Sequence, residues 1–577
     1  MRKMRSTFEW IPLPPFFSAE KDSVLDFSGL LDAPAGKYGR VEVKGDLLYF
    51  KGKHKPVRFN GTNLCFSANF PSHEQADLMV EEFARCGFNV LRFHHYDNLL
   101  VKHDEFRKDS TELDEQAIDA LDYLFAACKN KGIYLITDFY VSRKLLTGEI
   151  PEFPDRTIDM QEFKRLVLVN RSAFENLYRF SVNLLNHYNA YTGHLWKEDP
   201  ALLSINLVNE GMVEAGYGDW IEELYLDEFL KYAENENIQV ERSVNDPAYP
   251  AFLHNLYSRF NHIYRERIHR IGYHGLITDL NFLTKPHLIF FRKEQDIVEN
   301  HFYHSHPSFP ETPWRLPVIV NQESSISDGL SGMDYIFNSR ILGKPFSITE
   351  WNYAFPSETY LEGPFLTGAY ASLQNYSVLC RFAWSHSLNS MFSEDRTGTY
   401  FDSAPDPLRC LSERVMSCLF LRGDVKAADT ACTYVMNLQN PDSFNKAFRE
   451  QDNSKLEYLS KLALVYRTGI SFTDKELFDG KKMTAFYEKQ DLPENKENTK
   501  NIKYKTVDMM EDMWKSCCQY DGTVKSSTDE LEINLLKGNF KCITPKSEAF
   551  VLKKGQTLDG DFASVTVKDG FASFLVS

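Results

Sequence analysis

Leu203-Ser-Ile-Asn-Leu-Val-Asn-Glu210 and Pro345-Phe-Ser-Ile-Thr-Glu350-Trp-Asn are the two stretches that decide the fold. Each is an apolar run of strand character that ends in a carboxylate. An unpaired carboxylate in a buried strand is energetically costly, so a purely structural strand has no use for one at its tip. We therefore expect Glu210 and Glu350 to face one cleft from different strands of one sheet.

Strand and helix patterns alternate along the chain on both sides of these stretches. Strands are predicted at residues 57–64, 89–96, 132–140, 201–210, 275–281, 297–303, 345–350 and 379–384. Helices are predicted at residues 73–86, 113–129, 172–188 and 249–271. Repeated units of this kind form an open doubly wound sheet or a closed barrel. No GxGxxG motif follows the first strand, and the polar residues gather at the carboxyl ends of the strands, so we predict a (β/α)8 TIM barrel.

The segments on either side of the predicted barrel have a different sequence pattern. Residues 1–55 hold an N-terminal segment and a hairpin with a Gly45-Asp46 turn, expected to close the bottom of the barrel. The barrel itself is predicted over residues 56–425. Residues 426–577 consist of short alternating segments, which favour antiparallel strands and a C-terminal β-sandwich. A polar stretch near residues 494–503 is expected to be a loop inside this unit.

Charge and cysteine content exclude several classes of partner. The net charge of −16 argues against nucleic acid and against anionic membranes, since both require a basic face. No apolar run of membrane-spanning length occurs, and no apolar segment follows the basic N-terminus, so no signal peptide is expected. The ten cysteines are scattered and follow no disulfide framework. We therefore expect a cytoplasmic protein.

Five features occur in a fixed order at the ends of the predicted strands. They are Arg92, Asn209-Glu210, His301-Phe-Tyr303, Glu350 and Trp384, after strands two, four, six, seven and eight. In this order the chain resembles the clan A glycoside hydrolases, and within them the family five, cellulase-like pattern. The resemblance covers about residues 40–400 and implies β-glycoside hydrolysis on a TIM barrel. It departs from the family after strand three, where Asp138-Phe139-Tyr140 stands in place of the usual His.

The chemistry of a retaining hydrolase assigns roles to the two glutamates. One carboxylate must stay ionised as the nucleophile, and the other must be protonated when the sugar binds. Glu350 fits the nucleophile, because Arg92 and the Tyr303 hydroxyl are placed to hold its oxygens. Glu210 fits the acid/base, with Asn209 placed to hydrogen-bond the sugar 2-hydroxyl.

Further side chains are expected to contact the sugar. Trp384 would offer a flat apolar floor, and Trp351 would widen it. The remaining expected contacts are polar: Arg92, His94, His95, Asp138, Asn209, His301 and Tyr303. Asp279 and Asn281 are second-tier candidates for sugar hydroxyls. His94 and His95 also have a structural interpretation, as satisfied core histidines.

The histidines raise the alternative of metal catalysis. Metal-dependent hydrolases on this barrel usually carry His-x-His at the end of strand one, where this chain has Asn60-Gly-Thr-Asn-Leu. We therefore expect neither a metal nor another cofactor. Each feature taken alone also has a structural explanation, such as a cap, an ion pair or a core aromatic residue.

The sequence thus predicts a retaining β-glycoside hydrolase. Its expected partner is a glycoside or small β-linked oligosaccharide, a β-mannoside, β-glucoside or β-galactoside, cleaved from its end. Two alternatives stay open: a non-catalytic carbohydrate-binding relative, and a transglycosidase using the same glutamates. The C-terminal unit is also a candidate contact surface for a homo-oligomer.

Overall fold

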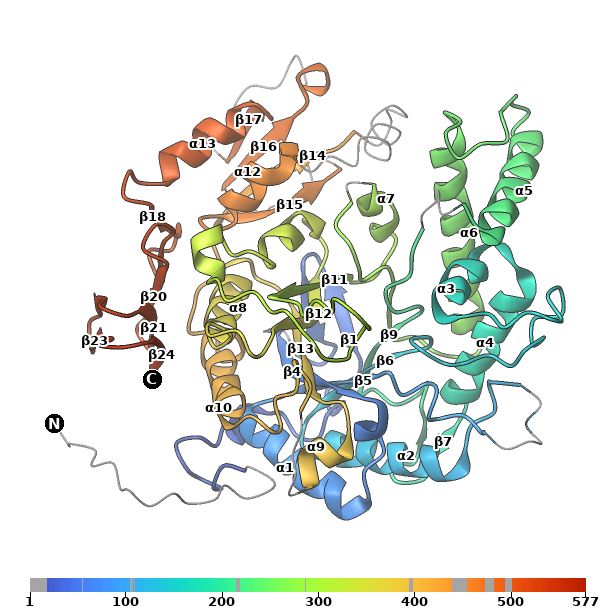
Figure 1. The fold of residues 1–577 in the computed structure, drawn as a ribbon, viewed down its shortest axis with the longest axis horizontal. Helices are drawn as coiled ribbons and strands as arrows, with labels where there is room; N and C mark the ends of the chain where they lie inside the picture. Colours follow the sequence, from blue (N-terminus) through green and yellow to red (C-terminus); the bar gives the residue numbers. More distant parts are fainter. Residues whose placement is uncertain are drawn as a thin grey trace.

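The centre of the molecule is a sheet of eight parallel strands, seen in the computed structural model in Figure 1. The structure describes residues 18–53, 55–103, 107, 109–213, 218–285, 287–393, 398–437, 454–472, 482–492 and 501–577. The eight strands are β4 (Phe59–Cys65), β5 (Val90–His94), β6 (Tyr134–Asp138), β9 (Leu202–Asn206), β10 (Leu276–Thr278), β11 (Val298–His304), β12 (Phe346–Tyr353) and β13 (Val378–Ser385).

The strands follow one another around a circle. Their order in the sheet is β10-β9-β6-β5-β4-β13-β12-β11, and every neighbouring pair is parallel. The gap between β10 and β11 is bridged by hydrogen bonds, including Asp296 N to Ile277 O at 3.2 Å and Thr278 Oγ1 to Ile297 O at 3.1 Å. The predicted TIM barrel is therefore confirmed.

Helices surround the sheet. The predicted ones are α1 (His73–Cys86), α2 (Glu115–Asn130), α4 (Arg171–Leu185) and α6 (Tyr249–Arg270). The others are α3 (Met160–Val169), α5 (Trp220–Asn235), α7 (Leu288–Arg292), α8 (Glu362–Leu373), α9 (Leu388–Phe392) and α10 (Pro407–Met416). Helix α8 escaped prediction because all of its residues are buried, which leaves no amphipathic period.

Helix α1 illustrates how local sequence sets an element's ends. Ser72 caps its N-terminus, and Ser72 and Gln75 form a reciprocal capping box. Gly87 ends the helix in the left-handed region, at φ 80°, where a glycine carries no steric penalty. Met79, Val80 and Phe83 are buried against the barrel, as predicted.

The N-terminal hairpin lies against the amino ends of the barrel strands. It consists of β1 (Val41–Lys44) and β2 (Leu47–Phe50), joined by β3 (Pro56–Val57). The Phe50 ring stacks on Tyr134 with centroids 5.5 Å apart, and meets Phe59 edge-on at 6.2 Å. Because Phe59 and Tyr134 are the first residues of β4 and β6, the hairpin lies against the closed end of the barrel, as predicted.

The C-terminal region is rich in strands, but its first sheet differs from the prediction. That sheet is parallel, with the order β15-β14-β16-β17. Its elements are β14 (Thr430–Val435), α12 (Ser454–Leu462), β15 (Arg467–Ser471), β16 (Lys482–Tyr487), β17 (Ile502–Thr506) and α13 (Met509–Cys517). The expectation of antiparallel strands is wrong here. Helix α12 lies between β14 and β15 in the chain and allows a parallel crossover, and β15 is buried along its whole length, as strands of covered parallel sheets are.

The second C-terminal sheet is antiparallel and lies beside α8 (Figure 1). It consists of β18 (Thr523–Lys525), β19 (Leu531–Asn534), β20 (Asn539–Ile543), β21 (Glu548–Lys553) and β24 (Phe571–Val576). Short hairpins are formed by β22 (Thr557–Asp559) with β23 (Ser564–Thr566), and by β7 (Tyr188–Asn189) with β8 (His194–Leu195). Most of the polar stretch expected to form a loop, residues 493–500, lies outside the described residues.

All ten cysteines are free thiols, as expected from their scattered spacing. Across the described ranges, none of the helices combines the length and the apolar character that crossing a membrane requires.

Candidate active site

A cavity of about 490 Å³ opens at the carboxyl ends of the barrel strands. Both glutamates singled out in the sequence, Glu210 and Glu350, line it. Of the other expected site residues, it is also lined by His94, His95, Asn209 and Tyr303. The barrel thus brings together side chains from positions far apart in the chain, as the order of motifs predicted.

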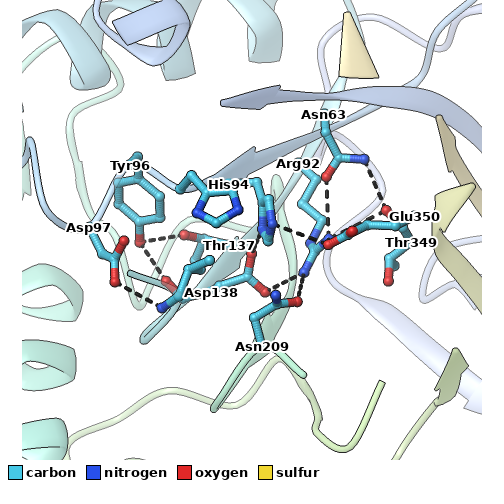
Figure 2. A network of polar contacts seen from close by, with 12 residues as sticks. Asn63, Arg92, His94, Tyr96, Asp97, Thr137, Asp138, Asn209, Thr349 and Glu350 are labelled. Carbon is cyan, nitrogen blue, oxygen red and sulfur yellow. Dashed lines mark hydrogen bonds and ion pairs between the residues drawn. The ribbon is translucent and has the colours of Figure 1, made fainter. Parts of the chain in front are cut away.

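Arg92 lies at the centre of the polar network shown in Figure 2. Its Nη1 atom lies 2.7 Å from Glu350 Oε1, and its Nη2 atom lies 2.8 Å from both Asp138 Oδ1 and Asn209 Oδ1. Burial opposes the charge of Arg92, but the neighbouring carboxylates of Asp138 and Glu350 outweigh burial and raise its pKa. One buried guanidinium therefore orients three site residues.

The Glu350 carboxylate receives donors on both oxygens. Besides Arg92, the Nε2 atom of His94 lies 3.1 Å from Oε1, and the Tyr303 hydroxyl donates to Oε2 at 2.6 Å. Such donors stabilise negative charge on a carboxylate. The contacts predicted from Arg92 and Tyr303 to Glu350 are therefore present.

Asp138 stands where the resembled family has a histidine. It contacts the ring nitrogen of His94 that faces away from Glu350. The Asp138 Oδ2 atom lies 2.7 Å from His94 Nδ1. Burial raises the pKa of Asp138, and burial, together with the charge of Arg92, lowers the pKa of His94. Asp138 thus fixes the orientation of the His94 ring, whose Nε2 atom faces Glu350 Oε1.

His301 lies between the two glutamates. Its Nδ1 atom is 3.3 Å from Glu210 Oε1 and 3.6 Å from Glu350 Oε2, and its Nε2 atom is 3.1 Å from Thr349 Oγ1. Thr349 donates its hydroxyl hydrogen to Glu299, so Thr349 Oγ1 accepts the proton of His301 Nε2. Burial lowers the pKa of His301 to about 4, which leaves the ring neutral. The unprotonated Nδ1 then faces Glu210 as an acceptor.

Glu210 has surroundings unlike those of Glu350. It follows strand β9 by four residues in a left-handed conformation, at φ 50°, and its backbone N–H donates to Asn281 Oδ1 at 2.7 Å. Its side chain is 28% exposed at the cavity wall. Burial raises the pKa of Glu210, with Lys164 and Arg92 acting in the opposite direction. A protonated Glu210 would donate to His301 Nδ1.

Glu210, His301 and Glu350 each place a possible ligand atom within 4.8 Å of the other two. An oxygen of Glu210 and an oxygen of Glu350 are therefore within 4.8 Å of each other. The same three side chains could in principle hold a metal ion. The Arg92 guanidinium already lies 2.7 Å from Glu350, so a metal ion bound there would meet a second positive charge at close range.

The prediction that Trp384 and Trp351 form the sugar platform is wrong. Trp384 is 1% exposed and packs edge-on against Phe83 of helix α1 at 5.2 Å, outside the cavity. Trp351 is equally buried and stacks on Phe302. Phe382 lines the cavity in their place.

The strands that carry Trp384 and Trp351 both contain an irregularity. In β13, the register against β4 shifts between Arg381 and Ser385, so simple alternation does not hold across Phe382 and Trp384. In β12, Thr349 is the extra residue of a bulge against β11, because Ile348 pairs with Asn300 and Glu350 with His301. Bulges of this kind re-aim side chains beside active sites.

Asn281 and Asp279, the second-tier candidates for sugar contacts, hold other residues of the site in place instead. Asn281 holds the Glu210 backbone and donates to Asn209 Oδ1 at 3.2 Å. Asp279 is buried behind the cavity, where it accepts from Val208 N at 3.2 Å and from the Tyr257 hydroxyl at 3.0 Å. Burial raises the pKa of Asp279 to about 7.

Several cavity residues were not predicted from the sequence. They are Phe66, Val141, Met160, Lys164, His306, Trp314, Phe382, His386, Thr399 and Phe401. Most lie on loops after the strands, where no periodic pattern exists, or on helix α3, which was not predicted. Trp314 is 60% exposed and offers the aromatic surface that was wrongly assigned to Trp384.

Comparison with known proteins gives structural neighbours alone. No protein-family model and no curated protein sequence matches this chain. An endo-1,4-β-mannanase from Rhizomucor miehei is 13% identical, with a TM-score of 0.42 over 66% of this chain and 99% of that one. A glycoside hydrolase family 5 mannosidase from the same organism is 14% identical, with a TM-score of 0.41 over 66% and 98%.

A β-glucanase from Saccharophagus degradans is also similar, at 16% identity and a TM-score of 0.36 over 70% of this chain and 97% of that one. Because these TM-scores are low, the assignment of the barrel depends on the strand pairing of this chain itself.

Proposed function

We propose that this chain is a retaining β-glycoside hydrolase in which Glu350 is the nucleophile and Glu210 is the acid/base. The observation that carries the proposal is the pair of glutamates within 4.8 Å of each other in unequal surroundings. Retaining enzymes hold their carboxyl groups about 5–5.5 Å apart, and inverting enzymes about 6.5–9.5 Å apart to admit a water. The short separation here therefore favours retention.

In the first step, a Glu350 oxygen attacks the anomeric carbon as the bond to the leaving oxygen breaks. Glu210 gives its proton to that oxygen, and the sugar becomes esterified to Glu350. Arg92, His94 and Tyr303 hold the Glu350 carboxylate in place through the contacts described above.

In the second step, water replaces the leaving group. The Glu210 carboxylate takes a proton from this water as the oxygen attacks the anomeric carbon, and the ester bond to Glu350 breaks. Glu210 is thereby reprotonated and the sugar leaves with its original configuration. A sugar hydroxyl in place of water would give transglycosylation by the same machinery.

Asn209 suits the role expected for it at the sugar 2-hydroxyl. Its Oδ1 atom accepts from Arg92 at 2.8 Å and from Asn281 at 3.2 Å, so the amide orientation is fixed. Asn209 lines the cavity, so its amide nitrogen is left to donate a hydrogen bond to the substrate. Exposed Trp314 and buried Phe382 supply apolar surfaces for the sugar ring.

A panel of 4-nitrophenyl α- and β-glycosides tests the proposed function. We expect release of 4-nitrophenol from at least one β-glycoside, with mannosides, glucosides and galactosides as the first neutral candidates. Loss of that activity in Glu210→Gln and Glu350→Gln variants of unchanged thermal stability would support the assignment. A folded protein that binds sugars but cleaves no glycoside would favour the non-catalytic alternative.

A further inference from the structure

Lys164 is a buried cation in the cavity wall that the proposed mechanism does not use. It lies on helix α3, is 3% exposed and lines the cavity together with Glu210 and Glu350. Within the ranges that the structure describes, its ammonium group makes no hydrogen bond and no ion pair.

Other buried cations of the barrel have hydrogen-bond acceptors, whether carboxylates or, as at Arg292, backbone carbonyls. Arg92 lies 2.8 Å from Asp138, Arg381 lies 2.7 Å from Glu413, and Arg414 lies 2.8 Å from Glu82. A buried charge without a partner is costly, so proteins rarely retain one without a use. The unpaired ammonium of Lys164 therefore calls for an acceptor that enters the cavity with the substrate.

The two glutamates of the cavity do not provide this acceptor. Both oxygens of Glu350 already accept from other side chains, and Glu210 makes its contact with His301. Their attraction favours the charge of Lys164, while burial acts more strongly to lower its pKa. An anion bound at Lys164 would supply the acceptor that its ammonium group lacks.

Two histidines line the same cavity as Lys164. His95 contacts Ser142 Oγ through Nδ1 at 3.1 Å, and His386 contacts Asp402 through Nδ1. Ser142 donates its hydroxyl hydrogen to Asp97, so it accepts from the Nδ1–H of His95. With the ring proton on Nδ1 in both histidines, Nε2 is an acceptor that suits a hydroxyl of the sugar. The rings of His95 and His386 lie 4.6 Å and 6.0 Å from the ring of Phe66, which also lines the cavity.

We propose that the glycoside cleaved here carries a singly charged acidic group, a carboxylate or a sulfate ester, which Lys164 binds, while His95 and His386 accept from hydroxyls of the same sugar. This inference rests on the proposed function and names its substrate class. A single charge fits because Lys164 is the one cation lacking a partner in this cavity wall, as far as the chain is described. A doubly charged phosphate would place excess negative charge beside Glu350.

Kinetics on matched substrates test the proposal. The pairs are the 4-nitrophenyl β-glucuronide and β-glucoside, the β-galacturonide and β-galactoside, and the 6-sulfated and unsulfated β-galactosides. We expect the parent to have a higher kcat/KM on at least one acidic member than on its neutral partner. A charge-assisted hydrogen bond corresponds to a factor of about 10–100, so Lys164→Met should reduce this ratio by about that factor.

Matched variants isolate the charge. Lys144→Met removes an exposed lysine that follows strand β6 and should leave the acidic-to-neutral ratio unchanged. Lys164→Gln provides a second removal of the charge should Lys164→Met be unstable. Equal ratios in the parent and in the folded Lys164 variants, for all three pairs, would overturn the proposal even if neutral glycosides are cleaved.

A binding measurement separates this inference from the proposed function. The intact 4-nitrophenyl glycosides are titrated into Glu350→Gln, and into the same variant carrying Lys164→Met, by calorimetry. Tighter binding of an acidic member that disappears with Lys164→Met supports the acidic subsite even if no glycoside is hydrolysed. Binding of both members with equal affinity, with or without Lys164, would contradict it.

Discussion

The Nδ1 atom of His301 lies 3.3 Å from the Oε1 atom of Glu210. Because Thr349 fixes the proton of His301 on Nε2, Nδ1 is an acceptor, and Glu210 satisfies it only when it carries a proton. The structure thus couples the proposed acid/base to a buried chain that runs from Glu210 through His301 and Thr349 to Glu299.

Thr349→Val should test this chain. The substitution keeps the shape of the side chain but removes the acceptor for His301 Nε2 and the donor for Glu299. A buried polar group left unsatisfied costs about 1–3 kcal/mol, so we expect a loss of stability of that order and a lower kcat. Chemical denaturation and steady-state kinetics measure the two effects.

Thr349→Ser retains the hydroxyl and is the matched control. It should keep most of the activity, since the chain from His301 to Glu299 survives. If Thr349→Val were as active as Thr349→Ser, the hydroxyl would have no part in orienting His301.

Phe382 and Trp384 should differ sharply when replaced by alanine. Trp384 is packed in the core against helix α1, so Trp384→Ala should destabilise the protein by about 3–5 kcal/mol. Phe382 lines the cavity, so Phe382→Ala should raise KM with a smaller loss of stability. Thermal unfolding and kinetics on the same glycoside check both outcomes, and the reverse pattern would restore Trp384 as the platform.

The order of strands and the two glutamates could be predicted because both produce patterns that can be recognised in the sequence. A polar residue at the tip of an apolar strand, as at Glu350, is visible without a structure. The wrong placement of Trp384 has a different origin, since a register shift in β13 cannot be recognised from residue alternation. Trp351 directly follows Glu350, so a strand would point its side chain to the opposite face, and alternation could have excluded it.

Lys164 and the parallel C-terminal sheet were beyond prediction for other reasons. A lysine in a helix usually faces solvent, and nothing in the local sequence of α3 shows that a cavity lies beside it. Strands β14 and β15 are only 6 and 5 residues long, and such short segments do not reveal whether their partners run parallel or antiparallel.

Asp279→Asn should change how stability depends on pH. Burial raises the pKa of Asp279 to about 7 in the folded protein, whereas the ordinary value of 3.8 applies when the chain is unfolded. The protonated group therefore contributes stability that is fully present below about pH 4 and is lost as pH rises to about 7. Relative to the parent, the variant should show a smaller decline in unfolding free energy across this window. Identical pH profiles would contradict the assignment.

Glu210→Ala should separate the two chemical steps. General acid assistance is worth about 10²–10⁴-fold and matters most for poor leaving groups, so cleavage of natural glycosides should fall by such a factor. Glycosides with an activated phenol should still form the ester on Glu350, and turnover should stall at its hydrolysis. Added azide should then restore turnover and give a β-glycosyl azide, identified by NMR. An unchanged rate on natural glycosides would exclude Glu210 as the acid.

The most direct test of the central claim is to trap the covalent intermediate. Glu210→Ala is incubated with a 2-deoxy-2-fluoro dinitrophenyl glycoside of whichever sugar the parent cleaves, and the protein is analysed by intact mass and peptide mapping. We predict one added glycosyl group, located on Glu350, and no labelling when Glu350→Ala is also present. A label on another residue, or a β-glycoside turned over by Glu350→Ala at a near-parental rate, would contradict the mechanism.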